Sequence, residues 1–313
     1  GLDFFPPTVE GIQLSSSRRG SPGTLKFTVL KDEAMGEIGG FAEGSSVTLQ
    51  VDDKPLFFGY IFVKRRDKSG AIECTAYDQI RYLKNKDIYV YEDKTAAEVV
   101  QMLAEDYGLK LGEVEQTQYK IASRTEENVT LLDMIETALD LELSHKGQMF
   151  VLYDDYGSLT LKNIANMRLD LLINSAAAEN FDYTSSIDEQ TYNQIKLAYA
   201  NKETGKWETY IAKDGEHINL WGLLQYFDTL EKDENGQAKA DALLQLYNSK
   251  TRRLKISNAL GDVRVRAGCL VGVALDLGDI IANTYMLVEK VTHTFKESEH
   301  FMDLTLRGGE FIA

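Results

Sequence analysis

Four histidines and two cysteines are the side chains of this sequence best suited to acid–base, nucleophilic or metal chemistry. No histidine lies in an H-E-x-x-H or similar metal-binding spacing. His293 and His300 flank a predicted turn, so a hairpin would place them close to each other and to Glu299. Such an arrangement suits a cross-strand polar pair, a zinc site or an acid–base site, and the pattern favours the polar pair.

The remaining candidates for catalysis fit structural roles. Cys74 falls on the apolar side of a predicted strand, which favours a core residue over a nucleophile. The adjacent Asp154 and Asp155 fit a turn, whereas glycosidase chemistry needs two carboxyl groups that face each other across a cleft. The glycine patterns of P-loops and dinucleotide sites are absent from the sequence. We therefore predict a protein that is not an enzyme, with no catalytic residues, no cofactor and no bound metal.

The overall composition argues against several other classes. The 313 residues carry 34 basic and 49 acidic side chains, a net charge of −15, which disfavours nonspecific binding to nucleic acid. Cys74 and Cys269 lie far apart and form no disulfide framework, so synthesis in a reducing compartment is the simplest inference. No apolar run is long enough to span a bilayer, and the start of the chain lacks a basic segment followed by an apolar one. We expect a soluble protein of two or three domains without a signal peptide.

The elements that position these residues begin with strands. Apolar residues alternate with polar ones at 25–29, 47–51 and 72–76, which is the period of two expected of half-buried strands. The strand at residues 56–63 is apolar on both faces, so one face should meet the core and the other a neighbouring element or chain. Residues 1–87 are therefore predicted to form an N-terminal β-barrel-like domain.

The middle segment has the period of helices. Thr95 followed by Glu98 predicts a capping box at the start of one helix, and Thr130 followed by Asp133 predicts the start of a second. A hairpin is predicted after them. Acidic side chains most strongly outnumber basic ones in this part of the chain, which indicates a separate domain or an acidic face that keeps it soluble. Residues 88–165 are predicted to form an acidic α+β domain of two helices and a hairpin.

The last segment returns to strands. Residues 166–313 are predicted to form a second β-barrel-like domain, with a helical insertion at about 236–254. The pattern at 44–52 recurs at 268–276 as glycine, two residues, three alternating apolar residues and aspartate, which indicates either a duplication or a chance match. The predicted fold class is α+β, mainly β, with two small antiparallel barrel-like domains, an acidic α+β domain between them and a helical insertion in the second half.

Several aromatic and basic side chains are candidates for contact with a partner. The aromatic residues of the strand at 56–63 and the two tryptophans suit either a partner surface or buried packing. The arginine clusters suit an acidic partner surface or the acidic middle domain of the same or a neighbouring chain. The candidate interface residues are Phe57, Phe58, Tyr60, Phe62, Arg65, Arg66, Trp207, Trp221, Arg252 and Arg253.

Several stretches of the chain also resemble a known family. They read CTAYDQIRYLKNKD and KTAAE, then GDVRVRAG, then VEKVTHTF and EHFMDL, and they occupy residues 74–87, 94–98, 261–268, 288–295 and 299–304. These stretches are similar to the XkdQ/YqbQ family of phage and prophage tail proteins. Together they extend over most of the chain.

This resemblance implies a structural hub of a contractile phage-tail-like baseplate. Such hubs are homotrimers with two related barrels per chain, so three chains present six similar units around a channel and adapt a sixfold tail tube to a threefold spike. The implied partners are further copies of the chain, the tail tube protein, the spike protein, and other baseplate and tape-measure proteins, with DNA only as cargo in the channel. The resemblance further implies synthesis in the bacterial cytoplasm and assembly into a phage, a prophage particle or a tail-like bacteriocin, without membrane insertion.

Two alternatives from other classes are left open by the sequence. A peptidoglycan hydrolase component of the tail would require a Cys/His or paired-carboxylate site, and the sequence offers none that stands out. A cell-wall-binding module is compatible with the size of the predicted domain at residues 88–165. Retention of that segment on purified cell wall would favour the binding module.

Overall fold

The computed structural model describes residues 5–30, 42–66, 68, 70–175, 180–188, 190–201, 205–230, 235–278, 281–296 and 298–308. The predicted class, α+β and mainly β, is confirmed. No sheet formed by the described residues closes into a barrel.

Five strands form the N-terminal half of the largest sheet: β1 (Thr8–Ser17), β2 (Thr24–Val29), β3 (Ser46–Val51), β4 (Lys54–Arg66) and β5 (Ile72–Tyr77). Their order is β1-β2-β5-β4-β3, and every pair is antiparallel. The predicted alternation is present, because Leu25, Phe27 and Val29 are buried together with alternate residues of β5. Asp52 and Asp53 join β3 to β4 with φ of 49° and 62°, as a two-residue hairpin turn requires.

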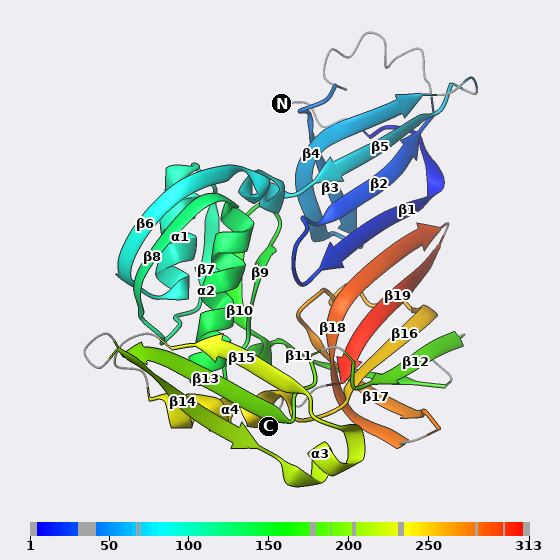
Figure 1. Cartoon of the computed structure of the whole chain (residues 1–313). Helices are drawn as coiled ribbons and strands as arrows, with labels where there is room; N and C mark the ends of the chain where they lie inside the picture. The colour runs from blue at the N-terminus through cyan, green and yellow to red at the C-terminus, as the bar shows by residue number, and fades with distance from the viewer. Residues whose placement is uncertain are drawn as a thin grey trace.

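Six strands form the C-terminal half: β11 (Arg168–Asn174), β12 (Asn180–Ser186), β16 (Thr251–Leu260), β17 (Leu270–Asp276), β18 (Ile281–Lys296) and β19 (Glu299–Gly308). Five of them follow the order β12-β16-β19-β18-β17 in antiparallel pairs, and β11 joins β17 in parallel. The two halves meet where β1 pairs with β18, so one sheet of eleven strands runs through both (Figure 1).

The two halves have the same topology. Counted along the chain, the five antiparallel strands of each half lie in the order first, second, fifth, fourth, third. The fourth strand of each half has a bulge against the fifth, directly after Ile61 in β4 and directly after Val288 in β18. Ahead of the third strand, Gly44 N–H donates to the Ile61 carbonyl at 2.7 Å, and Gly268 N–H donates to the Val288 carbonyl at 2.8 Å. This agreement supports a duplication over a chance match of the two sequence patterns.

An α+β unit follows the N-terminal half. It consists of η2 (Gln79–Lys84), β6 (Lys86–Lys94), α1 (Ala96–Asp106), β7 (Leu111–Val114), β8 (Ile121–Thr130), α2 (Leu131–Lys146), β9 (Phe150–Asp154) and β10 (Leu159–Asn163). The capping box is present, because Thr95 Oγ1 accepts from Glu98 N–H while Glu98 Oε2 accepts from Thr95 N–H. Ile80 and Leu83 pack in the core of this unit, which therefore begins before residue 88. A short helix, η3 (Ile164–Met167), leads from it into β11.

A second small unit lies between β12 and β16. It consists of β13 (Gln194–Asn201), β14 (Lys206–Lys213), α3 (Gly215–Trp221), β15 (Gln225–Thr229) and α4 (Gly236–Tyr247). Its three strands form a separate sheet, and Ile195, Leu197 and Leu243 are buried in its own core. The insertion is thus larger than the helix predicted at about 236–254. Strand alternation looks the same in either sheet, so the sequence pattern assigned these strands to the second β domain.

Candidate assembly surfaces

The histidine pair predicted at the last hairpin is present in the structure. His293 of β18 and His300 of β19 are joined by a hydrogen bond of 2.9 Å between His293 Nδ1 and His300 Nε2. His293 Nε2 donates to the carbonyl oxygen of Val265 at 2.9 Å, so Nδ1 accepts the N–H of His300. Burial lowers the pKa of His293 to about 4, which keeps the ring neutral near pH 7. The geometry is that of a cross-strand polar pair.

The alternatives weighed above, a metal site and a nucleophilic cysteine, have no matching site in the part of the chain that the structure describes. There, no group of three or more His, Cys, Asp or Glu side chains is placed to hold a metal ion. Cys74 and Cys269 are both buried, and burial raises the pKa of Cys74 to about 11. Such a thiol is protonated at neutral pH and is a poor nucleophile. Among the described helices, none has both the length and the apolar character needed to cross a membrane.

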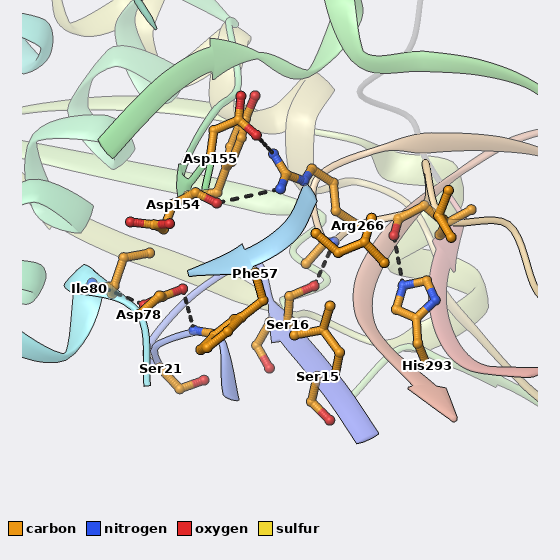
Figure 2. Close-up of a pocket in the computed structure, with 18 of the residues that line it drawn as sticks. Ser15, Ser16, Ser21, Phe57, Asp78, Ile80, Asp154, Asp155, Arg266 and His293 are labelled. Atoms are coloured by element: carbon orange, nitrogen blue, oxygen red, sulfur yellow. Dashed lines mark hydrogen bonds and ion pairs between the residues drawn. The ribbon is translucent and has the colours of Figure 1, made fainter. Parts of the chain in front are cut away.

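A pocket of about 270 Å³ lies where the two halves of the large sheet meet the α+β unit (Figure 2). Its wall includes Ser15 and Ser16 of β1, Phe57 of β4, Asp154 of β9 and His293 of β18. The polar groups of this pocket therefore lie between the two halves of the large sheet and the α+β unit.

Two carboxylates in the pocket, the buried Asp78 and the half-buried Asp154, accept hydrogen bonds that connect neighbouring segments. Asp78 accepts hydrogen bonds from the N–H groups of Gly23 at 2.8 Å and Ile80 at 3.0 Å, which ties the β1–β2 connection to the start of η2. Asp154 accepts from Gln79 Nε2 at 3.1 Å. Burial raises the pKa of both carboxyl groups, and the nearby Asp154 adds to the rise for Asp78. These hydrogen bonds connect the segment before β2 to η2, and η2 to β9.

Arg266 reaches the same pocket from the C-terminal half of the sheet. Its guanidinium carbon lies 4.0 Å from the ring centroid of Tyr153, and Nη1 lies 3.4 Å from Asp155 Oδ1. Nη2 also contacts the Asp154 carbonyl oxygen at 3.4 Å (Figure 2). Because these charged groups contact one another and the backbone, the pocket is best explained as a junction that orients the α+β unit.

The aromatic residues predicted on the strand at 56–63 divide between two faces of β4. Phe57 is 4% exposed in the N-terminal core, so its side chain is not on the surface of the folded chain. Phe58, Tyr60 and Phe62 are half-buried on the other face. The neighbouring rings are Tyr156 beside Phe58, Tyr82 beside Tyr60, and Tyr77 with Tyr82 beside Phe62. Part of this second face therefore lies against the α+β unit of the same chain.

The four candidate arginines lie near opposite ends of the large sheet. Arg65 and Arg66 are exposed at the end of β4, where Arg65 forms an exposed ion pair of 3.4 Å with a residue of β5. Arg252 and Arg253 belong to β16, and Arg252 Nε donates to the hydroxyl of Tyr183 in β12 at 3.1 Å. Because five strands lie between β4 and β16 in the sheet order, one chain does not bring the two pairs together.

The two tryptophans also lie apart, within the inserted unit. Trp207 is 63% exposed near the start of β14, where it pairs with Ala200. Trp221 ends α3, is half-buried and stacks on His217 with ring centroids 3.9 Å apart. Since α3 follows the far end of β14, the tryptophans do not form one patch.

The joint between β1 and β18 contains contacts that the sequence reasoning missed. Ser15 Oγ and Thr292 Oγ1 lie 3.0 Å apart across the two strands. Arg18 Nε donates to Glu289 Oε2 at 2.8 Å, and these side chains are only 11% and 25% exposed. In the sequence, β1 and β12 share a run of hydroxyl side chains at matching positions, which supports the internal repeat but does not indicate the joint.

Solved structures of phage tail and secretion-system proteins have a similar fold. The 43 kDa tail protein of prophage MuSo2 from Shewanella oneidensis has a TM-score of 0.68 and 12% identity, covering 95% of this chain and 93% of that chain. An E. coli component of the type VI secretion system, described as structurally similar to the T4 bacteriophage tail proteins gp27 and gp5, has a TM-score of 0.57 and 10% identity. That match covers 99% of this chain and 76% of the other. The chain therefore has a fold found in phage tail and secretion-system proteins.

Sequence comparison identifies the family. The model of the YQBQ-like family matches residues 12–307, so the chain belongs to this family. The phage-like element PBSX protein XkdQ of Bacillus subtilis (strain 168) is 27% identical over 308 residues, which cover 96% of this chain and 93% of that protein. The predicted family membership is confirmed.

Proposed function

We propose that this chain is the structural hub of a contractile phage-tail-like baseplate, in which three copies form a ring around a central channel. Membership of the YQBQ-like family and the fold shared with phage tail proteins support the tail role. The repeated five-strand topology is the observation that carries the hub. Two equivalent units per chain make six around a threefold ring, which suits a junction between a sixfold tube and a threefold spike.

Such a ring meets different partners on its two faces. The tail tube protein lies on one face and the spike protein on the other, with other baseplate and tape-measure proteins nearby. The net charge of −15 repels duplex DNA, so the channel passes DNA as cargo without retaining it. The chain is made in the bacterial cytoplasm and assembles into the particle, and this role requires no catalytic residue or cofactor.

Sedimentation velocity over a wide concentration range tests the ring, together with negative-stain images of the heaviest species. We expect a species of three 35.2 kDa chains with a central opening. The same measurement with the tube and spike proteins present detects a ring that assembles only on these partners as a template. A monomer under all of these conditions would contradict the proposed hub.

A further inference from the structure

Because the two halves repeat the same topology, each residue of a strand in one half has an equivalent residue in the other half. The equivalent cross-strand pairs are Leu14–Leu25 with Tyr183–Leu254, Leu25–Ala76 with Leu254–Leu306, and Ile61–Ala76 with Val288–Leu306. β12 therefore corresponds to β1 residue by residue, and the stretch of β4 after its bulge corresponds to the stretch of β18 after its bulge.

One contact of the C-terminal half has no counterpart within the chain. β1 pairs with β18 directly after the bulge, along the edge that β17 leaves free. The equivalent edge of β4 lies at residues 63–66, beyond the end of β3. Within the described ranges, no strand pairs with that edge or with the outer edge of β12, and Val63 is 50% exposed. Figure 1 shows β12 at one end of the sheet, far from β4.

We propose that β12 of one copy pairs with β4 of the next copy, in the antiparallel register that β1 uses on β18. The partner is a second copy of this chain, and the proposal rests on the ring function above, for which it names the interface. The register places Ser186 opposite Val63, Ser185 opposite Lys64, Thr184 opposite Arg65 and Tyr183 opposite Arg66. This head-to-tail contact uses a different surface on each copy, as a closed ring of identical chains requires.

A serine that anchors β1 is repeated in β12. Ser16 Oγ accepts a hydrogen bond of 3.1 Å from Ala267 N–H, one residue ahead of the glycine that precedes β17. The equivalent residues are Ser185 and Glu43, and Glu43 likewise stands one residue ahead of the glycine that precedes β3. Both are exposed in the single chain, so the bond from Glu43 N–H to Ser185 Oγ forms when the next copy docks.

The charges along the two edges are complementary. Arg65 has an exposed side chain at the end of β4, and Asp182 has one in β12. In the proposed register Asp182 lies two residues from Thr184, which places it diagonal to Arg65 on the same face of the sheet. The candidate arginines of β4 thus meet an acidic residue on the C-terminal half of a neighbouring copy.

The β1–β18 joint contains the Arg18–Glu289 ion pair, whereas the proposed β12–β4 joint has no charged residues at the equivalent positions. The counterparts of this ion pair are Ile187 and Phe62, both half-buried. Docking β12 on β18 would leave Glu289 against Ile187, and docking β1 on β4 would place Arg18 against Phe62. Each wrong pairing buries a charge without its partner, which is costly. The ion pair therefore favours the pairing of β1 with β18, and the apolar pair favours the pairing of β12 with β4.

Disulfide trapping tests this joint in the full chain. Thr184→Cys and Arg65→Cys occupy the positions equivalent to Ser15 and Thr292, whose oxygen atoms lie 3.0 Å apart within the chain, so the sulfur atoms should reach bonding distance. Mild oxidation of the double variant should yield covalent trimers on a non-reducing gel. Ser15→Cys with Thr292→Cys is the matched positive control and should close within one chain.

A second control separates specific pairing from random oxidation. Thr209→Cys on β14, combined with Arg65→Cys, keeps one exposed thiol at the joint and moves the other outside it. A native trimer that gives no T184C/R65C crosslink, while the positive control closes, overturns the joint and leaves the ring in place. Crosslinked open chains support the joint and contradict the threefold ring. A chain that neither associates nor crosslinks overturns the joint.

Charge substitution gives an independent readout of partner choice. Ile187→Arg places an unpaired charge against Phe62 and should weaken trimer formation by about tenfold or more. Ile187→Arg with Phe62→Glu recreates the ion pair of the other joint and should restore much of the affinity. Circular dichroism on each variant confirms that the monomer is folded. Trimers unaffected by Ile187→Arg would overturn the proposed register.

Discussion

Buried polar side chains in this protein hold one strand to another. His293 bridges Val265 and His300, and Arg18, directly after β1, pairs with Glu289 of β18. Because these groups are largely removed from water, a lost partner leaves a donor, an acceptor or a charge unsatisfied. Their substitution should therefore cost more than the loss of an exposed bond.

Acidification should destabilise the chain through His293. Burial lowers its pKa from 6.5 to about 4, so the unfolded chain binds the proton first as the pH falls. The contribution to stability is complete above the unfolded pKa and is lost as pH falls towards 4, by at most about 3 kcal/mol. Urea unfolding near pH 7 and near pH 4.5 measures this loss.

His293→Gln should reduce that pH dependence, because glutamine does not titrate and its amide can still donate to Val265. The wild type, measured at the same two pH values, is the reference for this comparison. An unchanged pH dependence in His293→Gln would contradict the role assigned to this ring.

Arg18→Ala should reduce the free energy of unfolding by about 3 kcal/mol. The variant leaves Glu289 partly buried, with Arg307 Nη1 3.9 Å from its Oε1 atom. Arg18→Ile with Glu289→Phe copies the residue types at the equivalent β12–β4 positions and should recover most of the loss. Urea unfolding of the three proteins measures both effects, and a double variant no more stable than Arg18→Ala would contradict the equivalence of the two sites.

At the scale of elements, β3 and β17 are equivalent strands in different surroundings. Each follows a glycine with positive φ, 88° at Gly44 and 94° at Gly268. A Cβ atom at Gly44 would meet nothing within 4 Å, whereas one at Gly268 would lie 2.7 Å from Val151 Cγ1. The difference arises because β9 of the α+β unit packs against the C-terminal half of the sheet.

Alanine at these two glycines should therefore have unequal effects. Gly44→Ala should cost about 1 kcal/mol, from the left-handed backbone alone. Gly268→Ala adds a steric clash with Val151 and should cost about 3 kcal/mol in all. Thermal unfolding of both variants gives the comparison, and equal losses would show that β9 does not pack tightly at this point.

At the scale of the whole molecule, the chain combines an acidic charge with a large sheet whose two end strands, β12 and β3, each have one edge that pairs with no other described strand. An open strand edge presents unpaired backbone groups, which favours pairing with another strand. The net charge opposes association with polyanions. Together these properties suit the proposed ring, in which copies of the chain bind one another and DNA passes through the channel.

The chain should not retain duplex DNA at physiological salt. The net charge of −15 gives it no excess of cations to replace the counterions of the phosphate backbone. Fluorescence anisotropy of a labelled duplex should show no change up to about 10 μM protein at about 0.15 M salt, where nonspecific DNA-binding proteins begin to bind. Saturable binding lost in Arg65→Ala/Arg66→Ala would instead assign the β4 arginines to DNA.

The sequence by itself determined the local elements and the family. Alternation predicted β2 and β5, a threonine and a glutamate three residues apart predicted the capping box of α1, and the family stretches predicted membership that the comparison confirms. Cys74 was also predicted to be buried from its strand position alone. These signals succeed because they depend on residues close together in the chain.

Only the tertiary structure decided which strands share a sheet. Ser15 and Thr292 are 277 residues apart in sequence, yet they are hydrogen-bonded at the joint. No local pattern indicates that β1 pairs with β18. The same limit hid the inserted sheet of β13, β14 and β15, and the covering of β4 by the α+β unit. Strand pairing depends on the register between distant segments, which the alternation of a single strand does not specify.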